Sequence, residues 1–241
     1  MKALVKKLQY KIAGLLLFFK IHAEASAQTG PNTFDEEIKF YKEADTSTAL
    51  PENPIVFIGS SSIKNWIGFD SVYGKYGAIN RGFGGSTLLD QIHYANDILL
   101  AHNARQFVIY CGENDFASAS NITAEQVFDR FMEMYRLLRS KYPNVPVVAI
   151  SMKPSPSKLD RMEKILAYNK LLQDYSLIDT SIIYADVYTP MLQANGFPNR
   201  SYFFSDMLHM NRSGYAVWNT VLEPLLLPAP VVVAEEVIAD K

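Results

Sequence analysis

Cysteine is almost absent from this sequence, and the few histidines are scattered along it. The single Cys111 cannot form a disulfide within the chain, and its apolar surroundings predict a buried structural thiol rather than a catalytic one. His22, His93 and His102 show no metal-ligand spacing, so no metal site is predicted. Because His93 falls among leucines and isoleucines of a predicted helix, we expect a structural role for it.

The chain also lacks an excess of positive charge. Its formal net charge is −2, and lysines and arginines do not cluster outside the N-terminus. Nucleic acids bind mainly through a basic field that neutralises phosphates. The composition therefore argues against a nucleic-acid partner.

No apolar stretch is long enough to span a bilayer as a helix, so stable membrane insertion is not expected. Near the N-terminus, several lysines precede the apolar stretch Ile12–Phe19, and Ala25-Ser26-Ala27 has the small residues of a cleavage site. This pattern predicts a signal peptide over residues 1–27, cleaved near Ala27, and export to the periplasm or the medium. Because Lys20 shortens the apolar stretch, an amphipathic N-terminal helix stays open as the alternative.

The rest of the chain is predicted to form one domain over residues 28–227, followed by a C-terminal tail over residues 228–241, because this length suits a single core. Short apolar runs alternate with longer stretches of helical or mixed pattern, which is typical of βαβ units and a parallel sheet. The five runs expected to be strands are Ile55–Ile58, Ala78–Ile79, Phe107–Tyr110, Val145–Ile150 and Ile182–Ala185.

The clearest predicted helix covers Ala124–Tyr142, with Thr123 and Gln126 suited to a capping box and Pro143 as a stop. Four further stretches have helical spacing: Phe34–Tyr41, Leu88–Leu100, Leu159–Tyr175 and Ser213–Leu226. Helices in these places can cover both faces of the sheet. We therefore expect an α/β fold, a three-layer α/β/α sandwich around a five-stranded parallel sheet.

Four polar motifs occur in this framework. They are Gly59-Ser60-Ser61-Ser62, Asn80-Arg81-Gly82-Phe83-Gly84-Gly85, Gly112-Glu113-Asn114-Asp115 and Asp206-Met207-Leu208-His209. The first three directly follow predicted strands, and the fourth lies before the last predicted helix. Because ligands bind beyond the carboxyl ends of parallel strands, we expect all four motifs to meet at one edge of the sheet.

The residue types in these motifs suit a serine hydrolase. A serine hydroxyl needs a base to remove its proton during attack, which the His209 imidazole can do while Asp206 holds the other ring nitrogen. Ser61 is the candidate nucleophile. The candidate oxyanion donors are the backbone N–H of Ser61, the backbone N–H of Gly85 and the side-chain amide of Asn114.

Each motif alone also has an ordinary structural explanation. The serines at 60–62 could cap a helix, Gly84-Gly85 could form a turn, and Asn114-Asp115 could be a turn or a cap. Asp206 and His209 could be a surface pair or half of a metal site. Their occurrence together, in this order, favours the catalytic interpretation. Two aromatic residues near the motifs, Trp66 and Phe83, could line the site, although core positions are slightly favoured.

Two other hydrolase or cofactor folds are disfavoured. The α/β-hydrolase elbow needs Gly-x-Ser-x-Gly, whereas Ile63 stands where its second glycine would be. The glycines at 82–85 do not form a dinucleotide-binding fingerprint, because Thr87 replaces the third glycine. No organic cofactor is therefore expected.

Taken together, the four motifs resemble those of the SGNH hydrolase superfamily, also called GDSL esterases and lipases, and the resemblance covers Ile55 to Leu226. It implies a flavodoxin-like sheet, Ser61 as nucleophile, Gly85 and Asn114 as oxyanion donors, and Asp206 with His209 to complete the triad. One departure is that Ser60 replaces the aspartate of the family name, which leaves open a shift of the nucleophile by one position.

We accordingly expect an exported serine esterase that forms an acyl-serine intermediate and acts on a small-molecule or glycan ester. The absence of a long apolar lid favours short acyl groups such as acetyl on carbohydrate. The first alternative is a lysophospholipase or thioesterase that acts on longer acyl chains. The second is a glycan-binding protein that has kept the fold but lost turnover.

Overall fold

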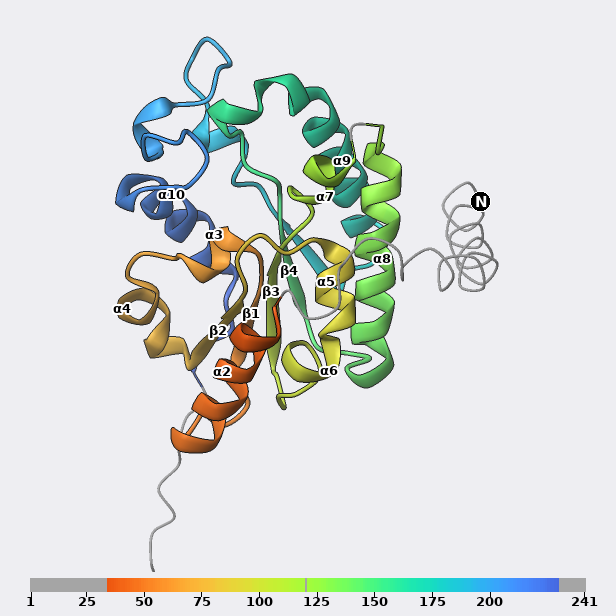
Figure 1. Ribbon diagram of the computed structural model, residues 1–241, viewed down its shortest axis with the longest axis vertical. Coiled ribbons are helices and arrows are strands. Elements are labelled where there is room, and N and C mark those ends of the chain that lie inside the picture. The colour runs from red at the N-terminus through yellow and green to blue at the C-terminus, as the bar shows by residue number, and fades with distance from the viewer. Residues whose placement is uncertain (1–33, 120, 230–241) are drawn as a thin grey trace, which may run out of the picture.

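The structure is a computed structural model, and it describes residues 34–119 and 121–229. The predicted signal peptide and nearly all of the predicted tail lie outside the described residues. At its centre is one five-stranded sheet, in which every pair of neighbouring strands is parallel (Figure 1). The strands are β1 (Ile55–Gly59), β2 (Ala78–Gly82), β3 (Gln106–Tyr110), β4 (Val147–Ile150) and β5 (Ile182–Ala185).

The strand order is β2-β1-β3-β4-β5, which is the order of a flavodoxin-like sheet. Strand β1 pairs with both β2 and β3. The order in which successive strands are added to the sheet therefore reverses after β2, on the two sides of β1. In the register of these pairs, Gly59 lies beside Gly82 on one side and Tyr110 on the other. The carboxyl ends of the first three strands are thus level with one another. The predicted fold class is confirmed.

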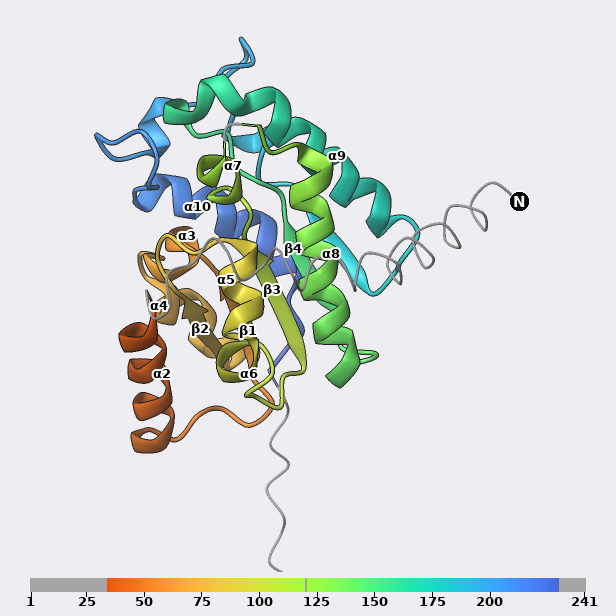
Figure 2. The same ribbon diagram turned by 45° about the vertical axis from the view of Figure 1, so that its right-hand side comes forward.

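Helices cover both faces of the sheet (Figures 1 and 2). Alternate residues of β1 point to opposite faces: Val56 and Ile58 belong to one core cluster, and Ile55 and Phe57 to the other. The helices are α2 (Asp35–Ser47), α3 (Ser61–Lys64), α4 (Phe69–Tyr73), α5 (Leu88–His93), α6 (Ala95–Ile98), α7 (Asp115–Ser118), α8 (Ala124–Lys141), α9 (Met162–Ser176) and α10 (Arg212–Leu222). The first cluster packs under α2, α5, α6, α8 and α9, and the second under α3, α4 and α10.

The helix predicted over residues 124–142 is α8. Its N-terminus has the expected capping box: the Thr123 hydroxyl accepts from the Gln126 N–H, and the Gln126 side chain accepts from the Thr123 N–H. The first predicted helix also exists as α2, although it continues to Ser47.

The single helix predicted over residues 88–100 is wrong. The chain forms two short helices there, α5 and α6, because Tyr94 leaves the helical conformation between them (φ −93°, ψ 16°). The Tyr94 hydroxyl donates to Asp35 at 2.7 Å, and its ring packs edge-on against Phe34 and Phe83. These contacts with α2 and its start hold Tyr94 at the break. His93, at the end of α5, is exposed.

Three other predicted elements are shorter than expected, and two of them begin or end close to a proline. Strand β4 begins at Val147, since Pro146 before it has no N–H to donate. Residues 156–161 form a separate 3-10 helix, η3 (Pro156–Arg161), before α9 begins. The last helix, α10, ends at Leu222, and Pro224 lies in the short 3-10 turn η6 (Glu223–Leu225) that follows it.

Strand β2 is longer than predicted because it contains a buried charged residue. The side chain of Arg81 is only 8% exposed and is paired with Asp45 of α2. Its Nε donates to His102 Nε2 at 3.2 Å. These partners allow a guanidinium to lie inside a strand that an apolar pattern would end at Ile79.

Trp66 and Phe83 are both core residues. Trp66 packs with Phe57 and Trp218 in an aromatic group on the α10 side of the sheet, and Phe83 is fully buried in the other cluster. Cys111 is buried, and burial raises the pKa of its thiol well above the usual value. A structural thiol is what the sequence predicted.

Within residues 34–119 and 121–229, no helix is long and apolar enough to cross a membrane. The same residues contain no group of three or more histidine, cysteine, aspartate or glutamate side chains placed to hold a metal ion.

Candidate active site

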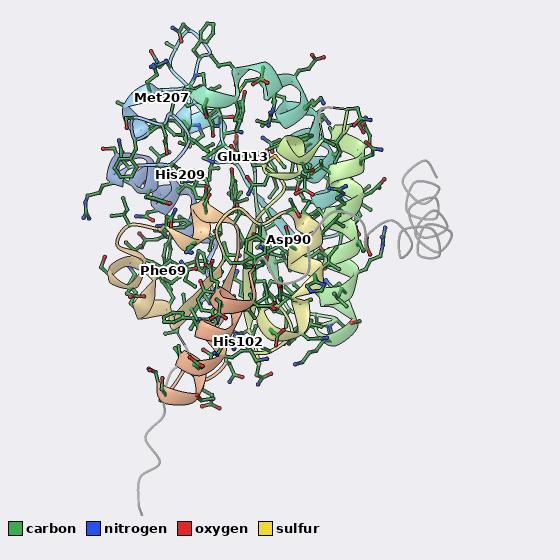
Figure 3. All side chains as sticks on the ribbon, viewed as in Figure 1. Phe69, Asp90, His102, Glu113, Met207 and His209 are labelled. Atoms are coloured by element: carbon green, nitrogen blue, oxygen red, sulfur yellow. The ribbon has the colours of Figure 1, made fainter. Side chains whose placement is uncertain are left out.

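The four polar motifs meet at the carboxyl end of the sheet. Ser61 begins α3 just after β1, Gly85 lies in the loop after β2, and Asn114 follows β3. Asp206 and His209 lie in the loop before α10. Figure 3 shows Glu113, Met207 and His209 toward this end of the molecule and His102 toward the opposite end.

The turn that presents Ser61 depends on Gly59. This residue has φ +155°, and a Cβ atom there would lie 2.0 Å from the backbone oxygen of Tyr110. Only glycine allows β1 to pass so close to β3 at this point. The chain can therefore turn sharply into α3 with Ser61 as the first residue of the helix.

Among the three consecutive serines, Ser61 alone is partly exposed, since Ser60 and Ser62 are buried. Ser60 occupies the N-cap position of α3, but its side chain makes no capping hydrogen bond. The simple helix-capping explanation therefore does not hold for this motif.

Ser61, His209 and Asp206 form a hydrogen-bonded row. The Ser61 Oγ lies 3.2 Å from His209 Nε2, and His209 Nδ1 lies 2.6 Å from Asp206 Oδ2. The two nitrogens of one imidazole thus face a hydroxyl on one side and a carboxylate on the other. This arrangement lets the ring accept the hydroxyl proton while the carboxylate fixes its tautomer.

The Asp206–His209 segment is a tight turn held by its own carboxylate. Asp206 Oδ1 accepts from the backbone N–H groups of Leu208 (2.9 Å) and His209 (3.0 Å). Burial acts to raise the pKa of Asp206, but these two bonds and the bond from the His209 ring outweigh it and lower the pKa to about 2. Asp206 is therefore ionised at every pH at which an esterase works. Met207, at the centre of the turn, has a left-handed backbone conformation (φ +57°).

The three candidate oxyanion donors lie in loops around Ser61. As the first residue of α3, Ser61 has an N–H group without an intrahelical acceptor. Gly85 has φ +83° and is exposed, and no atom lies within 4 Å of the position a Cβ would take. Asn114 makes no capping bond to α7; its Nδ2 donates one proton to the Ser86 oxygen at 3.0 Å, which leaves its second N–H for another acceptor.

Two buried polar side chains hold these loops together: Gln91, which the sequence did not reveal, and Asp115, which belongs to the third motif and was expected in a turn or cap. Gln91 of α5 donates to the Gly59 oxygen (3.1 Å) and to Ser86 Oγ (2.7 Å), which joins the loops after β1 and β2. Asp115 accepts from the Leu88 N–H (2.9 Å) and from Arg130 (2.8 Å), which joins the start of α5 to α7. Asp115, the first residue of α7, is fully buried, and these two donors satisfy its carboxylate.

The site is open to solvent. The side chain of His209 is 36% exposed and that of Asp206 is 47% exposed. Beside them, the Phe204 N–H donates to the His209 oxygen at 2.9 Å, and the neighbouring pair Phe203 and Met210 forms an antiparallel bridge. Phe203 and Met210 are buried, so Phe204 and His209 share the outward face of this hairpin. Phe204 is 49% exposed.

Comparison with known families agrees with this geometry. Residues 61–217 match the GDSL-like lipase/acylhydrolase family, which is well over half of the chain. The chain belongs to this family. It is a member of the SGNH hydrolase superfamily, as its motifs predicted, and is an ester hydrolase. Among curated proteins, no match is found.

Solved structures share the fold at low sequence identity. A GDSL-like lipase from Bacteroides thetaiotaomicron has a TM-score of 0.68 and 22% identity, with 78% of this chain and 96% of that chain covered. A Streptococcus pneumoniae protein named for platelet activating factor has a TM-score of 0.70 and 16% identity, with 88% and 99% covered. A mutant form of an acetyl-xylooligosaccharide esterase from Geobacillus has a TM-score of 0.58 and 13% identity, with 73% and 95% covered.

Proposed function

We propose that Ser61, His209 and Asp206 are the catalytic triad of a serine esterase. The observation that carries this proposal is the unbroken row of hydrogen bonds from the Ser61 hydroxyl through the imidazole to the Asp206 carboxylate. Ser61 Oγ attacks the ester carbonyl while its proton passes to His209 Nε2. His209 then gives this proton to the leaving alkoxide, which departs as the alcohol. Water, activated by the same imidazole, hydrolyses the acyl-serine and releases the acid.

During both attacks the carbonyl oxygen becomes negatively charged. We assign the stabilisation of this oxyanion to the backbone N–H groups of Ser61 and Gly85 and to the free N–H of Asn114. Donors that are already held in place need no rearrangement as the charge develops, and losing one typically costs roughly 3 to 4 kcal/mol of barrier. The contacts of Gln91 and Asp115 with these loops support such pre-organisation.

The preferred substrate in this proposal is a short acyl ester, such as acetyl, on a carbohydrate. Two features support it. The exposed triad gives room to a large alcohol portion, whereas a long acyl chain gains binding free energy only where it is buried, about 0.8 kcal/mol per CH₂. The exposed ring of Phe204 beside His209 offers an apolar surface to the face of a sugar. The acetyl-xylooligosaccharide esterase with the same fold suggests acetylated sugars as a first probe.

Export of the protein is also part of the proposal. It rests on the lysines, the apolar stretch and the small residues of positions 1–27, which lie outside the described residues. Expression of the full chain with a C-terminal tag, followed by N-terminal sequencing of the protein in the periplasm or medium, tests it. A new N-terminus at Gln28 supports a signal peptide, and an uncleaved chain retained inside the cell contradicts it.

The substrate proposal is tested by hydrolysis of p-nitrophenyl esters from acetyl to dodecanoyl. The variants Ser61→Ala and Ser62→Ala are measured in parallel. Each removes one hydroxyl group, from one of two adjacent serines, of which Ser62 is buried. We expect the highest kcat/KM with acetyl, loss of turnover in Ser61→Ala, and retained turnover in Ser62→Ala. A second assay, release of acetate from acetylated xylooligosaccharides, then addresses the alcohol portion.

Two other results of this assay would change the proposed substrate or the proposed nucleophile. Activity that peaks at long acyl chains would replace the acetyl proposal by a lysophospholipase or thioesterase function. Loss of activity in Ser62→Ala but not in Ser61→Ala would move the nucleophile by one position.

A further inference from the structure

The loop after β4 contributes a buried charge that no step of the proposed reaction uses. Lys153 lies just after this strand, and its Nζ forms an ion pair with Oε2 of Glu113, the residue before Asn114. The two side chains are 2% and 7% exposed. Since desolvation offsets the attraction inside a protein, such a pair stabilises a fold no better than two apolar side chains would. Its position beside a candidate oxyanion donor therefore points to a role other than stability.

Both oxygens of the Glu113 carboxylate have fixed partners. Oε2 also accepts from the Tyr110 hydroxyl at 2.8 Å, and Oε1 accepts from Ser155 Oγ at 3.0 Å. Burial acts to raise the pKa of Glu113, but Lys153 and these donors outweigh it and lower the pKa. Glu113 is thus an ionised side chain that holds groups from β3 and from the loop after β4 in one place.

The loop after β4 is itself firmly attached to the sheet and to α9. Asn169 of α9 accepts from the Met152 N–H at 2.7 Å and donates to the Met152 oxygen at 3.0 Å. The Ser151 hydroxyl accepts from the N–H groups of Val187 (3.0 Å) and Tyr188 (3.1 Å) after β5. Lys153 and Ser155 therefore extend from a rigid base.

The same loop contacts the turn that carries the triad. The Ser157 N–H donates to the Met207 oxygen at 3.0 Å, and Met207 lies between Asp206 and His209. Segment 151–157 is thus bonded to the Asn114 loop through Glu113 and to the acid–base turn through Met207. Figure 3 shows Glu113 and Met207 at the same end of the molecule.

We propose that the Glu113–Lys153 ion pair positions Asn114 as an oxyanion donor by fixing its loop to segment 151–157. Glu113 is the chain neighbour of Asn114, so holding its carboxylate limits the movement of the Asn114 amide relative to His209. Glu113 and Lys153 are positioning residues that act through Asn114. This inference rests on the proposed function, which gives Asn114 its role.

The test is a double-mutant cycle on kcat for p-nitrophenyl acetate. The variant Glu113→Gln/Lys153→Met removes both charges and keeps similar side-chain volumes, so no unpaired charge is left buried. It is measured in the native sequence and in an Asn114→Ala background. Because a small misplacement of a catalytic group lowers the rate without weakening ground-state binding, we expect kcat to fall about tenfold and KM to change less than about twofold.

In the Asn114→Ala background the same pair of changes should lower kcat less than about twofold, because the group that it positions is already gone. The control is Asp45→Asn on α2, which breaks the ion pair with the buried Arg81 of β2. This variant should lower stability and leave kcat unchanged. If the double variant does not fold, Ser155→Ala, which removes only the bond to Glu113 Oε1, replaces it with an expected fall of about threefold and the same dependence on Asn114.

Full kcat in the folded double variant would overturn the inference, as would an equal loss in both backgrounds. Failure of the proposed function looks different. In that case Ser61→Ala or Asn114→Ala would itself leave turnover intact, whatever the effect of the ion pair.

Discussion

The Asp206 carboxylate has two tasks within a single turn. One oxygen accepts hydrogen bonds from the backbone N–H groups of Leu208 and His209. The other accepts a hydrogen bond from the imidazole Nδ1–H. The first task shapes the turn and the second sets the tautomer of the ring. The side-chain oxygen of an asparagine can still accept from the backbone N–H groups of the turn. Its NH₂ group, however, cannot accept a hydrogen bond from Nδ1.

Asp206→Asn should therefore fold and lose turnover. We expect kcat for p-nitrophenyl acetate to fall by roughly 10³- to 10⁴-fold, because the amide would favour the wrong imidazole tautomer. Since the pKa of Asp206 is lowered to about 2, its charge does not change between pH 5 and pH 9, and the variant should be impaired throughout this range. Steady-state kinetics over this range and a circular dichroism spectrum check both parts. Turnover close to that of the native protein would remove Asp206 from the triad.

The exposed ring of Phe204 is expected to affect specificity for the alcohol portion of the ester. Phe204→Ala should lower kcat/KM for acetylated xylooligosaccharides by roughly fivefold, since covering the exposed half of a phenyl ring contributes about 1 kcal/mol. For ethyl acetate, whose alcohol is too small to cover the ring, kcat/KM of the variant should stay within about twofold of that of the native protein. Phe40→Ala on α2 removes a ring that is even more exposed (65%) but far from Phe204 in the sequence, and it serves as the control. Equal losses on both esters would mean that Phe204 supports His209 instead of contacting the alcohol.

At the level of residues, the sequence predicted those side chains that carry a recognisable motif. Ser61, Asn114 and His209 could be named because their residue types and order match a known chemistry. Gln91 and Lys153 could not, because a buried polar side chain is recognisable only from its partners. Those partners, the Gly59 oxygen and the Glu113 carboxylate, come from distant parts of the chain.

Among the elements, the contact between the ends of β1 and β3 is the most sensitive to substitution. Gly59→Ala places a methyl group against the Tyr110 oxygen, and the left-handed backbone adds strain. We expect a loss of about 3 kcal/mol or more in the free energy of unfolding. Gly196→Ala also has a positive φ (+80°) but meets no atom within 4 Å, so it should lose only about 1 to 2 kcal/mol. Urea unfolding of both variants measures the difference, and equal losses would contradict the steric argument.

The elements whose bounds were predicted wrongly differ from the prediction for the same physical reason. The helical spacing of apolar residues continues through Tyr94, but its hydroxyl and ring bind α2 and the segment before it, and these contacts break the helix into α5 and α6. Strand β2 continues through Arg81, although the apolar run ends earlier, because Asp45 and His102 satisfy the guanidinium. In both cases tertiary contacts outweigh the local pattern, which a single sequence does not reveal.

For the whole molecule, the pH dependence of stability should be separable from catalysis. His102 is buried at the end of the molecule opposite His209 (Figure 3). Burial, together with the charges of Arg81 and Lys141, outweighs the attraction of Asp45 and lowers the pKa of His102 to about 4. The folded protein thus keeps this ring neutral, with Nε2 accepting from Arg81.

Protonation of His102 links the stability of the protein to pH. Between pH 6.5 and about 4 the unfolded chain binds a proton at His102 that the folded chain does not, so stability falls as the pH is lowered. The loss across this range is about 3 kcal/mol for this residue. His102→Gln keeps an acceptor for Arg81 but does not titrate, so its free energy of unfolding should vary less over the same range. Parallel pH profiles for the two proteins would contradict a neutral buried His102.

The central claim is that an acyl group becomes covalently attached to Ser61. A fluorophosphonate probe reacts with an activated serine and leaves a stable adduct, which intact-mass and peptide mass spectrometry can place on one residue. We predict a single adduct on Ser61 in the native protein and in Ser62→Ala, and none in Ser61→Ala. An adduct on Ser60 or Ser62, or no adduct on folded protein that cleaves esters, would contradict the account.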